Sequence, residues 1–427
     1  MRAATQSLRR TLAVTAVAAV AASALAACSS SSDNGGGSNN SSSPNASSAF
    51  GAANKATDTP VTIGFISDGK SASIDVTDEI KGAQAAAEYA NNYLGGLAGH
   101  EIKVETCQAQ AVPAKATACA NQMVSDNVAG VVEASFGEVD QSITVLSKAK
   151  IPLFIHAAST QLALSTPGVF NFTNALSYFG TPMADAKKQG LSSLDMVTID
   201  VPAAAGPAKQ LGPLLGSNIG LKVTVTTIPP GTADMTPQIA AANQSKPGDF
   251  MLFGDPTFCA GALKAVRTAA PNTPVSMIDR CIAPGAASSV PGGYNGVRVV
   301  TTSDLDPSRP DVKMFQAGLE KWGDGAKFGP TAASGWAPML GMITALNAAK
   351  ITDLTPAGLT AAIKSAPPTE YPLSGGIQFE CNGKQIGISP NICASDGIMA
   401  TADESGNLSD YERVTADPKL YSLPTGG

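Results

Sequence analysis

The chain has 427 residues, of which 44% are hydrophobic and 15% are charged. This length predicts two or three domains, each with its own core, and the composition excludes a highly charged disordered chain. There are 28 Lys and Arg against 34 Asp and Glu. A nucleic-acid-binding protein needs a basic surface, so the acidic balance argues against that class.

Residues 1–27 are predicted to be an export signal, because a start with three arginines precedes an uncharged run rich in Ala, Val and Leu. The run ends in Leu-Ala-Ala-Cys, which resembles the bacterial lipobox. We therefore expect Cys28 to be lipidated and to hold the chain on the outer face of the cell membrane. An ordinary cleavage site is one alternative, and a twin-arginine signal at Arg9 and Arg10 is another. No later apolar run is long enough for a second membrane anchor.

A flexible linker is predicted at residues 28–58. Residues 29–48 contain ten Ser, four Asn and three Gly and show no apolar periodicity. Such a segment cannot bury enough surface to fold.

Six cysteines remain after Cys28, an even number that suggests disulfides in an exported chain. Fifteen pairings are formally possible. The cysteines lie in three near-neighbour pairs, and we expect these pairs to form: Cys107 with Cys119, Cys259 with Cys281, and Cys381 with Cys393. Metal binding is the rival interpretation, but the chain lacks a CxxC spacing and contains two histidines, His100 and His156. We expect neither a metal nor a cofactor.

The chain alternates between strands and helices after the linker. Strands are predicted at residues 61–66, 102–105, 130–134 and 152–156, and helices at 80–94, 114–127 and 138–148. The alternation begins again with strands at 196–201, 222–227, 250–254 and 274–278, and helices at 204–215, 235–244 and 257–269. Repeated βαβ units predict parallel sheets covered by helices, so two runs predict two α/β lobes.

The chain is expected to pass more than once between the two lobes. Residues 297–302 are predicted to cross between them, and a long helix follows with Trp336, Met339, Ile343 and Leu346 on one face. The expected division gives residues 59–177 and about 303–345 to the N-lobe, residues 178–302 and about 346–415 to the C-lobe, and residues 416–427 to a tail. Open α/β sheets bind ligands at the carboxyl ends of their strands, so facing lobes predict a cleft that holds a small molecule.

The opening of the folded part resembles a known family. The stretch Ile63-Gly64-Phe65-Ile66, the pair Gly82-Ala83 and residues 89–102 (YANNYLGGLAGHEI) are similar to the start of the type I periplasmic binding proteins of the branched-chain amino-acid group. Three further segments are similar to this family: the early cysteine pair, residues 335–350 and residues 403–411. The resemblance implies two Rossmann-like lobes joined by a multi-strand hinge, with a cleft between them. It also implies a monomeric solute-binding component of an ABC importer, which passes its solute to a membrane permease.

Candidate ligand residues follow the N-lobe strands: Asp68, Ser135, Phe136, Ala158, Ser159 and Thr160. Hydroxyls and backbone N–H groups at strand ends suit a carboxylate, to which they donate charge-assisted hydrogen bonds. The resemblance puts Ser135, Ala158 and Thr160 on positions that hold the carboxylate of an amino acid. Helix capping or turn formation is the alternative role for Ser135 and Thr160, and core packing is the alternative for Phe136.

The C-lobe departs from the family. Ala204-Ala205-Gly206 stands where amino-acid binders present a tyrosine, and Cys259 aligns with a glutamate that holds the ammonium. Asp255 is a candidate replacement, although Asp255-Pro256 also forms a good helix start. Phe258 either stacks on the ligand or packs in the core. Tyr178 either lines the hinge or is exposed in a linker.

Two sequence patterns typical of enzymes, the P-loop and the nucleophile elbow, do not point to catalysis here. Residues 64–71 match GxxxxGK[ST], but the first glycine lies inside a predicted strand and helical periodicity begins only near Asp78, so a P-loop is not expected. No GxSxG elbow occurs, and His156 is expected to be buried and structural. We expect a non-enzyme that binds a small carboxylate-bearing metabolite. A ligand-sensing receptor for a signalling partner is the alternative, ahead of an exported hydrolase.

Overall fold

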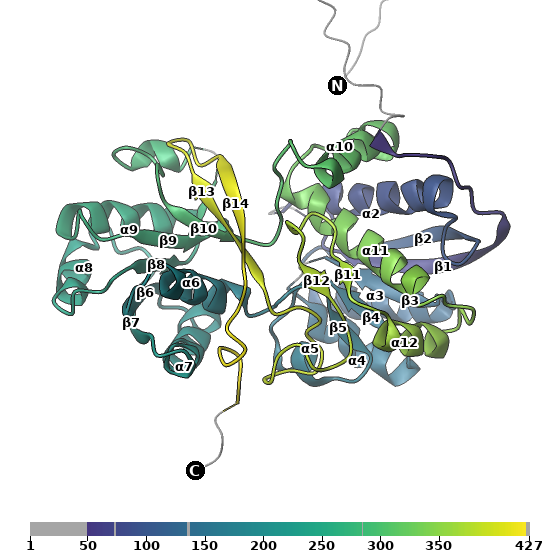
Figure 1. Ribbon diagram of the computed structural model, residues 1–427, viewed down its shortest axis with the longest axis horizontal. Coiled ribbons are helices and arrows are strands. Elements are labelled where there is room, and N and C mark those ends of the chain that lie inside the picture. The colour runs from purple at the N-terminus through teal and green to yellow at the C-terminus, as the bar shows by residue number, and fades with distance from the viewer. Residues whose placement is uncertain (1–48, 72–73, 135–136, 284, 424–427) are drawn as a thin grey trace, which may run out of the picture. The chain divides into compact units, whose positions relative to one another are not determined.

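The computed structural model describes residues 49–71, 74–134, 137–283 and 285–423, which all belong to one compact unit (Figure 1). Their strands form two large sheets, one of five strands and one of seven, and a small two-stranded sheet. Each large sheet has its own cluster of buried hydrophobic residues. The α/β class with two lobes is therefore confirmed.

The N-lobe sheet has the strand order β2-β1-β3-β4-β5, and all its pairs are parallel. Its strands are β1 (Asp58–Ser67), β2 (His100–Gln108), β3 (Gly130–Glu133), β4 (Leu153–Ile155) and β5 (Val169–Asn171). Its connecting helices are α2 (Thr77–Tyr89), α3 (Pro113–Ser125), α4 (Val139–Ala149) and α5 (Gln161–Ser165). A π-helical turn, Ala90–Leu94, extends α2 and ends at Gly95, whose φ is 74°. Glycine adopts this left-handed conformation without steric cost, which explains the helix end expected there.

The C-lobe sheet has the order β14-β13-β10-β9-β8-β6-β7. Its parallel strands are β6 (Ser193–Ile199), β7 (Lys222–Ile228), β8 (Phe250–Phe253), β9 (Val275–Ile278) and β10 (Arg298–Thr301). Its antiparallel edge consists of β13 (Gly397–Ala402) and β14 (Leu408–Val414). Its helices are α6 (Ser177–Lys188), α7 (Pro202–Asn218), α8 (Thr236–Asn243) and α9 (Pro256–Ala269). Most of the predicted crossing segment 297–302 thus forms strand β10, and the crossing itself follows it.

The chain returns to the N-lobe after β10. This return comprises α10 (Pro310–Trp322), α11 (Pro330–Ala348), α12 (Pro356–Ser365), β11 (Thr369–Glu370) and β12 (Gln378–Phe379). Leu359, Ile363 and Phe379 are buried among N-lobe residues. The segment 346–381 therefore packs on the N-lobe, whereas the sequence-based division places it in the C-lobe; farther along the chain, Ile386 and Ile392 belong to the C-lobe cluster. Within the described residues the chain crosses between the large sheets three times, after β5, β10 and β12.

Helices α2 and α11 lie side by side in the N-lobe (Figure 1). Their close approach depends on two glycines. A side-chain carbon at Gly82 would overlap the backbone oxygen of Ala332, and one at Gly335 would overlap the backbone oxygen of Glu79. The hydroxyl of Ser334 also donates to Glu79 Oε1 at 3.1 Å, which ties the two helices together.

The folded part begins earlier than the expected linker end at residue 58. Phe50 is 5% exposed and packs against Tyr89, Tyr93 and Trp322 with ring centroids 4.9–5.6 Å away. The backbone N–H of Asn54 donates to the carbonyl of Asn92 at 3.0 Å. The sequence analysis missed this anchor because a single aromatic residue after a polar stretch has no periodicity.

Three disulfides join the six cysteines in the expected pairing: Cys107 with Cys119, Cys259 with Cys281, and Cys381 with Cys393. The first joins β2 to α3, and the second joins α9 to the turn after β9. Cys28 and the expected signal lie outside the described residues. In the part of the chain that the structure covers, no helix combines the length and apolarity needed to cross a membrane.

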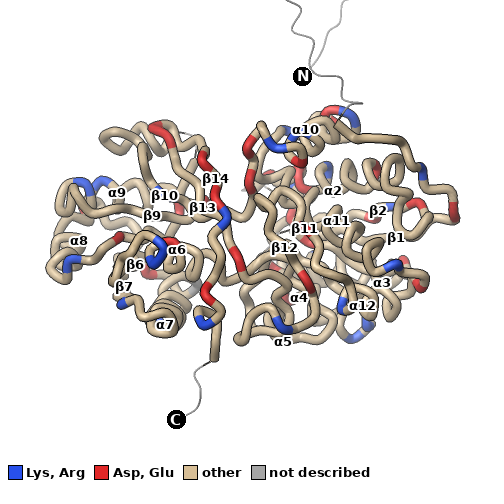
Figure 2. Tube along the Cα trace, in the orientation of Figure 1, with Lys and Arg blue, Asp and Glu red and all other residues tan. Residues whose placement is uncertain are grey.

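The P-loop pattern does not have P-loop geometry. Gly64 lies within β1, and the next helix, α2, begins at Thr77 rather than at Lys70. Lys70 forms an exposed ion pair with Asp75 at 2.7 Å. Figure 2 shows Lys and Arg interspersed with Asp and Glu along both lobes, in keeping with the exclusion of a basic binding face.

Candidate ligand-binding cleft

A cavity of about 960 Å³ lies between the lobes. Its walls come from the carboxyl ends of strands in both large sheets: β1 and β4 in the N-lobe, and β6, β8 and β9 in the C-lobe. This is where parallel sheets place their ligands, and the volume falls in the range of small-molecule sites. Six of the nine candidate ligand residues line it: Asp68, Ala158, Ser159, Thr160, Tyr178 and Asp255.

The other three candidates are not among the residues that line the cavity. Ser135 and Phe136 lie outside the described residues. Phe258 does not line the cavity, since its side chain is 4% exposed and belongs to the C-lobe core. Cys259 is fully buried in a disulfide, so it does not occupy a ligand-facing position.

The N-lobe groups are partly engaged already. The backbone N–H of Ala158 donates to Asn171 Oδ1 at 2.7 Å. The hydroxyl of Thr160 caps α5 by accepting from the N–H of Ala163, and it donates to Asp140. Ser159 is exposed to the cavity, and its hydroxyl makes no hydrogen bond to another described residue. Of the two hydroxyls, that of Ser159 is therefore the one with hydrogen-bonding capacity left for a ligand.

Buried acids lie behind the N-lobe wall. Asp68 is 7% exposed and accepts from the N–H of Ala111 at 2.8 Å. Glu133, at the end of β3, is fully buried, and the side chain of Ser142 interacts with its carboxyl group and opposes the rise of its pKa. Burial raises its pKa to about 8, and the charge of Asp68 adds to this effect. Burial also raises the pKa of Glu138, as does Asp68. The carboxyl group of Glu133 is thus neutral at pH 7.

Glu79 belongs to the same group of acids. It accepts from the hydroxyl of Ser67 at 2.6 Å, and burial raises its pKa to about 7. Its hydrogen bonds to Ser67 and Ser334 oppose that rise, because they stabilise the charged form.

The C-lobe wall is mainly apolar. Phe179 from α6 and Phe253 from β8 stack with ring centroids 5.0 Å apart, and both line the cavity with Ile199 and Ile278. Ala204 also lines it. This wall can receive the hydrocarbon part of a ligand.

Two polar candidates stand on the C-lobe side. The hydroxyl of Tyr178 donates to Asp279 Oδ1 at 2.7 Å. Asp255 is exposed, and its Oδ1 accepts from the N–H of Phe258 at 2.9 Å, so it caps α9 while it also lines the cavity. Its second oxygen is available to a donor on a ligand.

The sequence analysis missed Arg280. This residue follows β9 in a short 3₁₀ turn, is exposed, and lines the cavity. It lies beside Tyr178, whose pKa it lowers against the raising effects of burial and Asp279. The rule applied to the N-lobe, that ligand groups follow the strands, would have found it after the predicted strand 274–278.

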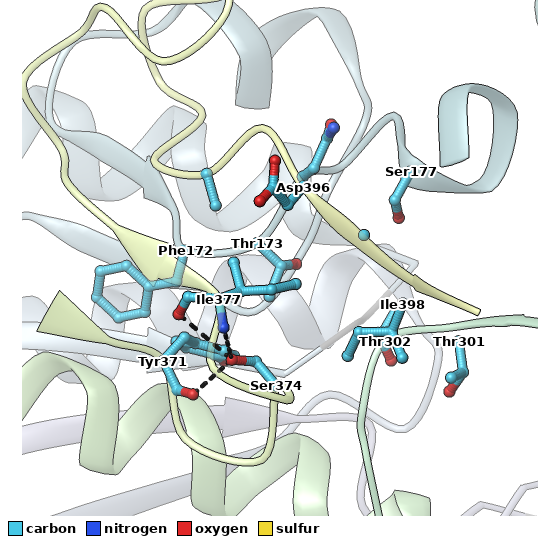
Figure 3. Close-up of a pocket in the computed structure, with 13 residues that line it drawn as sticks. Phe172, Thr173, Ser177, Thr301, Thr302, Tyr371, Ser374, Ile377, Asp396 and Ile398 are labelled. Atoms are coloured by element: carbon cyan, nitrogen blue, oxygen red, sulfur yellow. Dashed lines mark hydrogen bonds between the residues drawn. The ribbon is translucent and has the colours of Figure 1, made fainter. Parts of the chain in front are cut away.

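A second cavity, of about 20 Å³, lies at the hinge (Figure 3). It has room for about one water molecule. It is lined by one residue from each crossing segment: Thr173, Thr302 and Asp396. Beside it, the hydroxyl of Ser374 donates a hydrogen bond to the carbonyl of Tyr371 at 2.7 Å, within the same loop. Asn174, Ser177 and Thr302 line both this cavity and the cleft, so the hinge and the cleft share residues.

His156 has a structural environment. It is fully buried, and its Nδ1 lies 2.7 Å from the hydroxyl of Tyr371. Burial lowers its pKa to about 4, so the ring is neutral at pH 7. It does not line the cleft.

Three solved structures share this fold at low sequence identity. A fatty acid ABC transporter substrate-binding protein from Thermomonospora curvata has a TM-score of 0.64 and 17% identity, over 87% of this chain and 96% of that chain. A branched-chain amino acid transporter substrate-binding protein from Streptococcus pneumoniae, in complex with isoleucine, has a TM-score of 0.61 and 17% identity, over 83% and 99%. A solute-binding protein from Rhodopseudomonas palustris HaA2, in complex with p-hydroxybenzoic acid, has a TM-score of 0.63 and 18% identity, over 85% and 98%.

The family assignment rests on the sequence. No curated protein matches it at a significant level. A family model described as periplasmic binding protein matches residues 60–390, which is more than half of the chain. The resemblance first seen in residues 63–102 is thereby confirmed: with its two parallel sheets and the cavity between them, the chain belongs to the periplasmic binding protein family.

Proposed function

We propose that the chain is the substrate-binding protein of an ABC importer, and that it captures a small carboxylate-bearing metabolite with an apolar portion. It is a binding protein and not an enzyme, like the other members of the periplasmic binding protein family. The observation that carries the proposal is the cavity of about 960 Å³, which has an apolar wall of stacked rings and a few polar groups at strand ends. Isoleucine, p-hydroxybenzoic acid and the fatty acids named for the similar structures all carry a carboxylate.

The proposed contacts are the candidate residues of both lobes. Asp68, Ala158, Ser159 and Thr160 face the ligand from the N-lobe, together with Ser135 and Phe136. Tyr178 and Asp255 face it from the C-lobe, and Asp255 is suited to an ammonium or amide donor. We do not retain Phe258 as a contact, because it is buried in the core.

The test is a thermal-shift and calorimetry screen of the purified chain with its disulfides intact. The panel contains isoleucine, p-hydroxybenzoate and decanoate. A bound acid at 100 times its Kd should raise the free energy of unfolding by about 2.7 kcal/mol. A panel of neutral sugars of similar size serves as the control. Stabilisation by sugars and by none of the acids would refute the proposed ligand class.

We further propose that Cys28 is lipidated, so that the chain works on the outer face of the membrane beside its permease, as a monomer. The Leu-Ala-Ala-Cys sequence that ends the apolar N-terminal run supports this. Substitution Cys28→Ser should release the protein from the membrane fraction, whereas Cys28-containing protein should label with a radioactive fatty acid. Loss of solute uptake in a deletion strain would support the importer role, and loss of only a transcriptional response would support the receptor alternative.

A further inference from the structure

We infer that Arg280 of the C-lobe, and not the N-lobe loop after β4, binds the ligand carboxylate. This inference rests on the proposed function and specifies how the cleft recognises an acid. The resemblance implies that Ala158 and Thr160 hold the carboxylate, so this inference turns the ligand end to end in the cleft.

Arg280 forms no close ion pair with a described residue, although its charge lowers the pKa of the neighbouring Asp279 carboxyl against the raising effect of burial. Arg280 is exposed within the cleft. The neighbouring Asp279 accepts from Tyr178 at 2.7 Å instead. Cys281 holds the turn to α9 through its disulfide with Cys259. The disulfide therefore holds the backbone that carries Arg280. Its guanidinium interacts with the hydroxyl of Tyr178, and because a guanidinium has five N–H donors, others remain for a bidentate pair with a carboxylate.

The N-lobe wall disfavours an anion. The N–H of Ala158 and the hydroxyl of Thr160 are already engaged with Asn171 and Asp140. Asp68 lines the same wall, and its charge is felt by both Glu133 and Glu138. A carboxylate placed there would meet a like charge, which is unfavourable in a poorly solvated cleft.

The apolar wall adjoins Arg280. Ile278 is the last residue of β9, two positions before Arg280, and it lines the cavity with the stacked rings of Phe179 and Phe253. The C-lobe wall thus offers a cation at Arg280 beside hydrocarbon contacts, and it also carries the carboxylate of Asp255. An acid with an apolar body matches this order, with its carboxylate on Arg280 and its body against the rings.

The experiment measures the Kd of the purified full chain for isoleucine, p-hydroxybenzoate and decanoate, and for the matching carboxamides, by calorimetry. The variants are Arg280→Gln, Arg280→Lys and the N-lobe variant Ser159→Ala. Lys209→Gln is the matched control, because Lys209 is an exposed C-lobe cation that does not line the cavity.

Wild-type protein should prefer the acid over its amide, and Arg280→Gln should weaken acid binding about 10- to 100-fold, the effect of one lost charge-assisted interaction. The amide should bind the variant and the wild type alike, so the preference for the acid disappears. Arg280→Lys should keep part of that preference, and Lys209→Gln should keep all of it. Thermal melts without ligand should be unchanged, since Arg280 is exposed.

Two results would overturn the inference. If Arg280→Gln keeps the acid preference while Ser159→Ala loses it, the carboxylate lies on the N-lobe and only this inference fails. If wild-type protein binds none of the acids, the proposed ligand class fails and the inference fails with it.

Discussion

At the scale of single residues, burial decides what a polar side chain does, and burial is the property that sequence position predicts least well. Glu133 and Asp68 both end N-lobe strands, yet Asp68 lines the cleft and Glu133 is sealed beneath it. The strand-end rule applied to the N-lobe found four residues that line the cavity: Asp68, Ala158, Ser159 and Thr160. It could not separate Thr160 as a helix cap from Ser159 as an exposed hydroxyl, because both follow the same strand.

The buried carboxyl of Glu133 makes stability depend on pH. Its pKa in the folded chain is about 8, above the ordinary 4.5, so the unfolded chain loses this proton first as pH rises. The protonated carboxyl of Glu133 therefore makes its full contribution to the free energy of unfolding below pH 4.5, and this contribution is lost as pH rises towards 8. Glu133→Gln removes the titration. The variant should become more stable than wild type by up to about 1.4 kcal/mol for each pH unit in this window.

Urea unfolding of both proteins at several pH values checks this prediction. Glu101→Gln is the control, because Glu101 lies on β2 in the same sheet but is exposed. The control should differ from wild type by a constant, small amount. A difference between Glu133→Gln and wild type that does not change with pH would show that Glu133 is ionised in the folded chain.

At the scale of elements, long periodic segments were predictable and short or discontinuous ones were not. The strands predicted at 61–66 and 222–227 lie within β1 and β7, and the helix predicted at 257–269 matches α9 within a residue. The paired strands β11 and β12 have two residues each, too few for any alternation. Strand β10 was taken for a crossing because sequence cannot show which sheet a short apolar run joins.

The aromatic anchor at Phe50 gives a prediction at this scale. Phe50→Ala should lower the free energy of unfolding by about 3 kcal/mol, since it removes a buried ring from contact with Tyr89, Tyr93 and Trp322. Both tryptophans of the chain, Trp322 and Trp336, belong to or pack against the N-lobe cluster, so their fluorescence during urea unfolding reports on this lobe. Phe328→Ala is the control, because Phe328 is 43% exposed. Equal losses in the two variants would show that Phe50 is not an anchor.

At the scale of the whole folded unit, the two lobes and the cleft were predictable because the strand-helix alternation occurs twice. The assignment of residues 346–381 was not. Their buried side chains belong to the N-lobe core, but the same apolar spacing would suit either lobe, and only the packing of Leu359, Ile363 and Phe379 decides.

The volume of the cleft gives a prediction at this scale. A single small acid fills only part of about 960 Å³, so the lobes should approach each other when the ligand binds. Small-angle X-ray scattering should therefore show a smaller radius of gyration at saturating ligand. The same protein with a neutral sugar at the same concentration controls for solvent effects. An unchanged radius with calorimetrically proven binding would mean that the cleft does not close.

The pairing of α2 with α11 also bears on how the chain is made. Glu79 and Ser334 are 255 residues apart, so the ribosome releases α2 long before its partner exists. At ordinary rates of synthesis this delay is roughly 10 to 50 s, and through it the apolar face of α2 has no native cover. The N-lobe thus cannot finish folding before the C-lobe strands β6 to β10 have been synthesised. Whatever prevents aggregation of the nascent chain has to act on the first lobe for that whole interval.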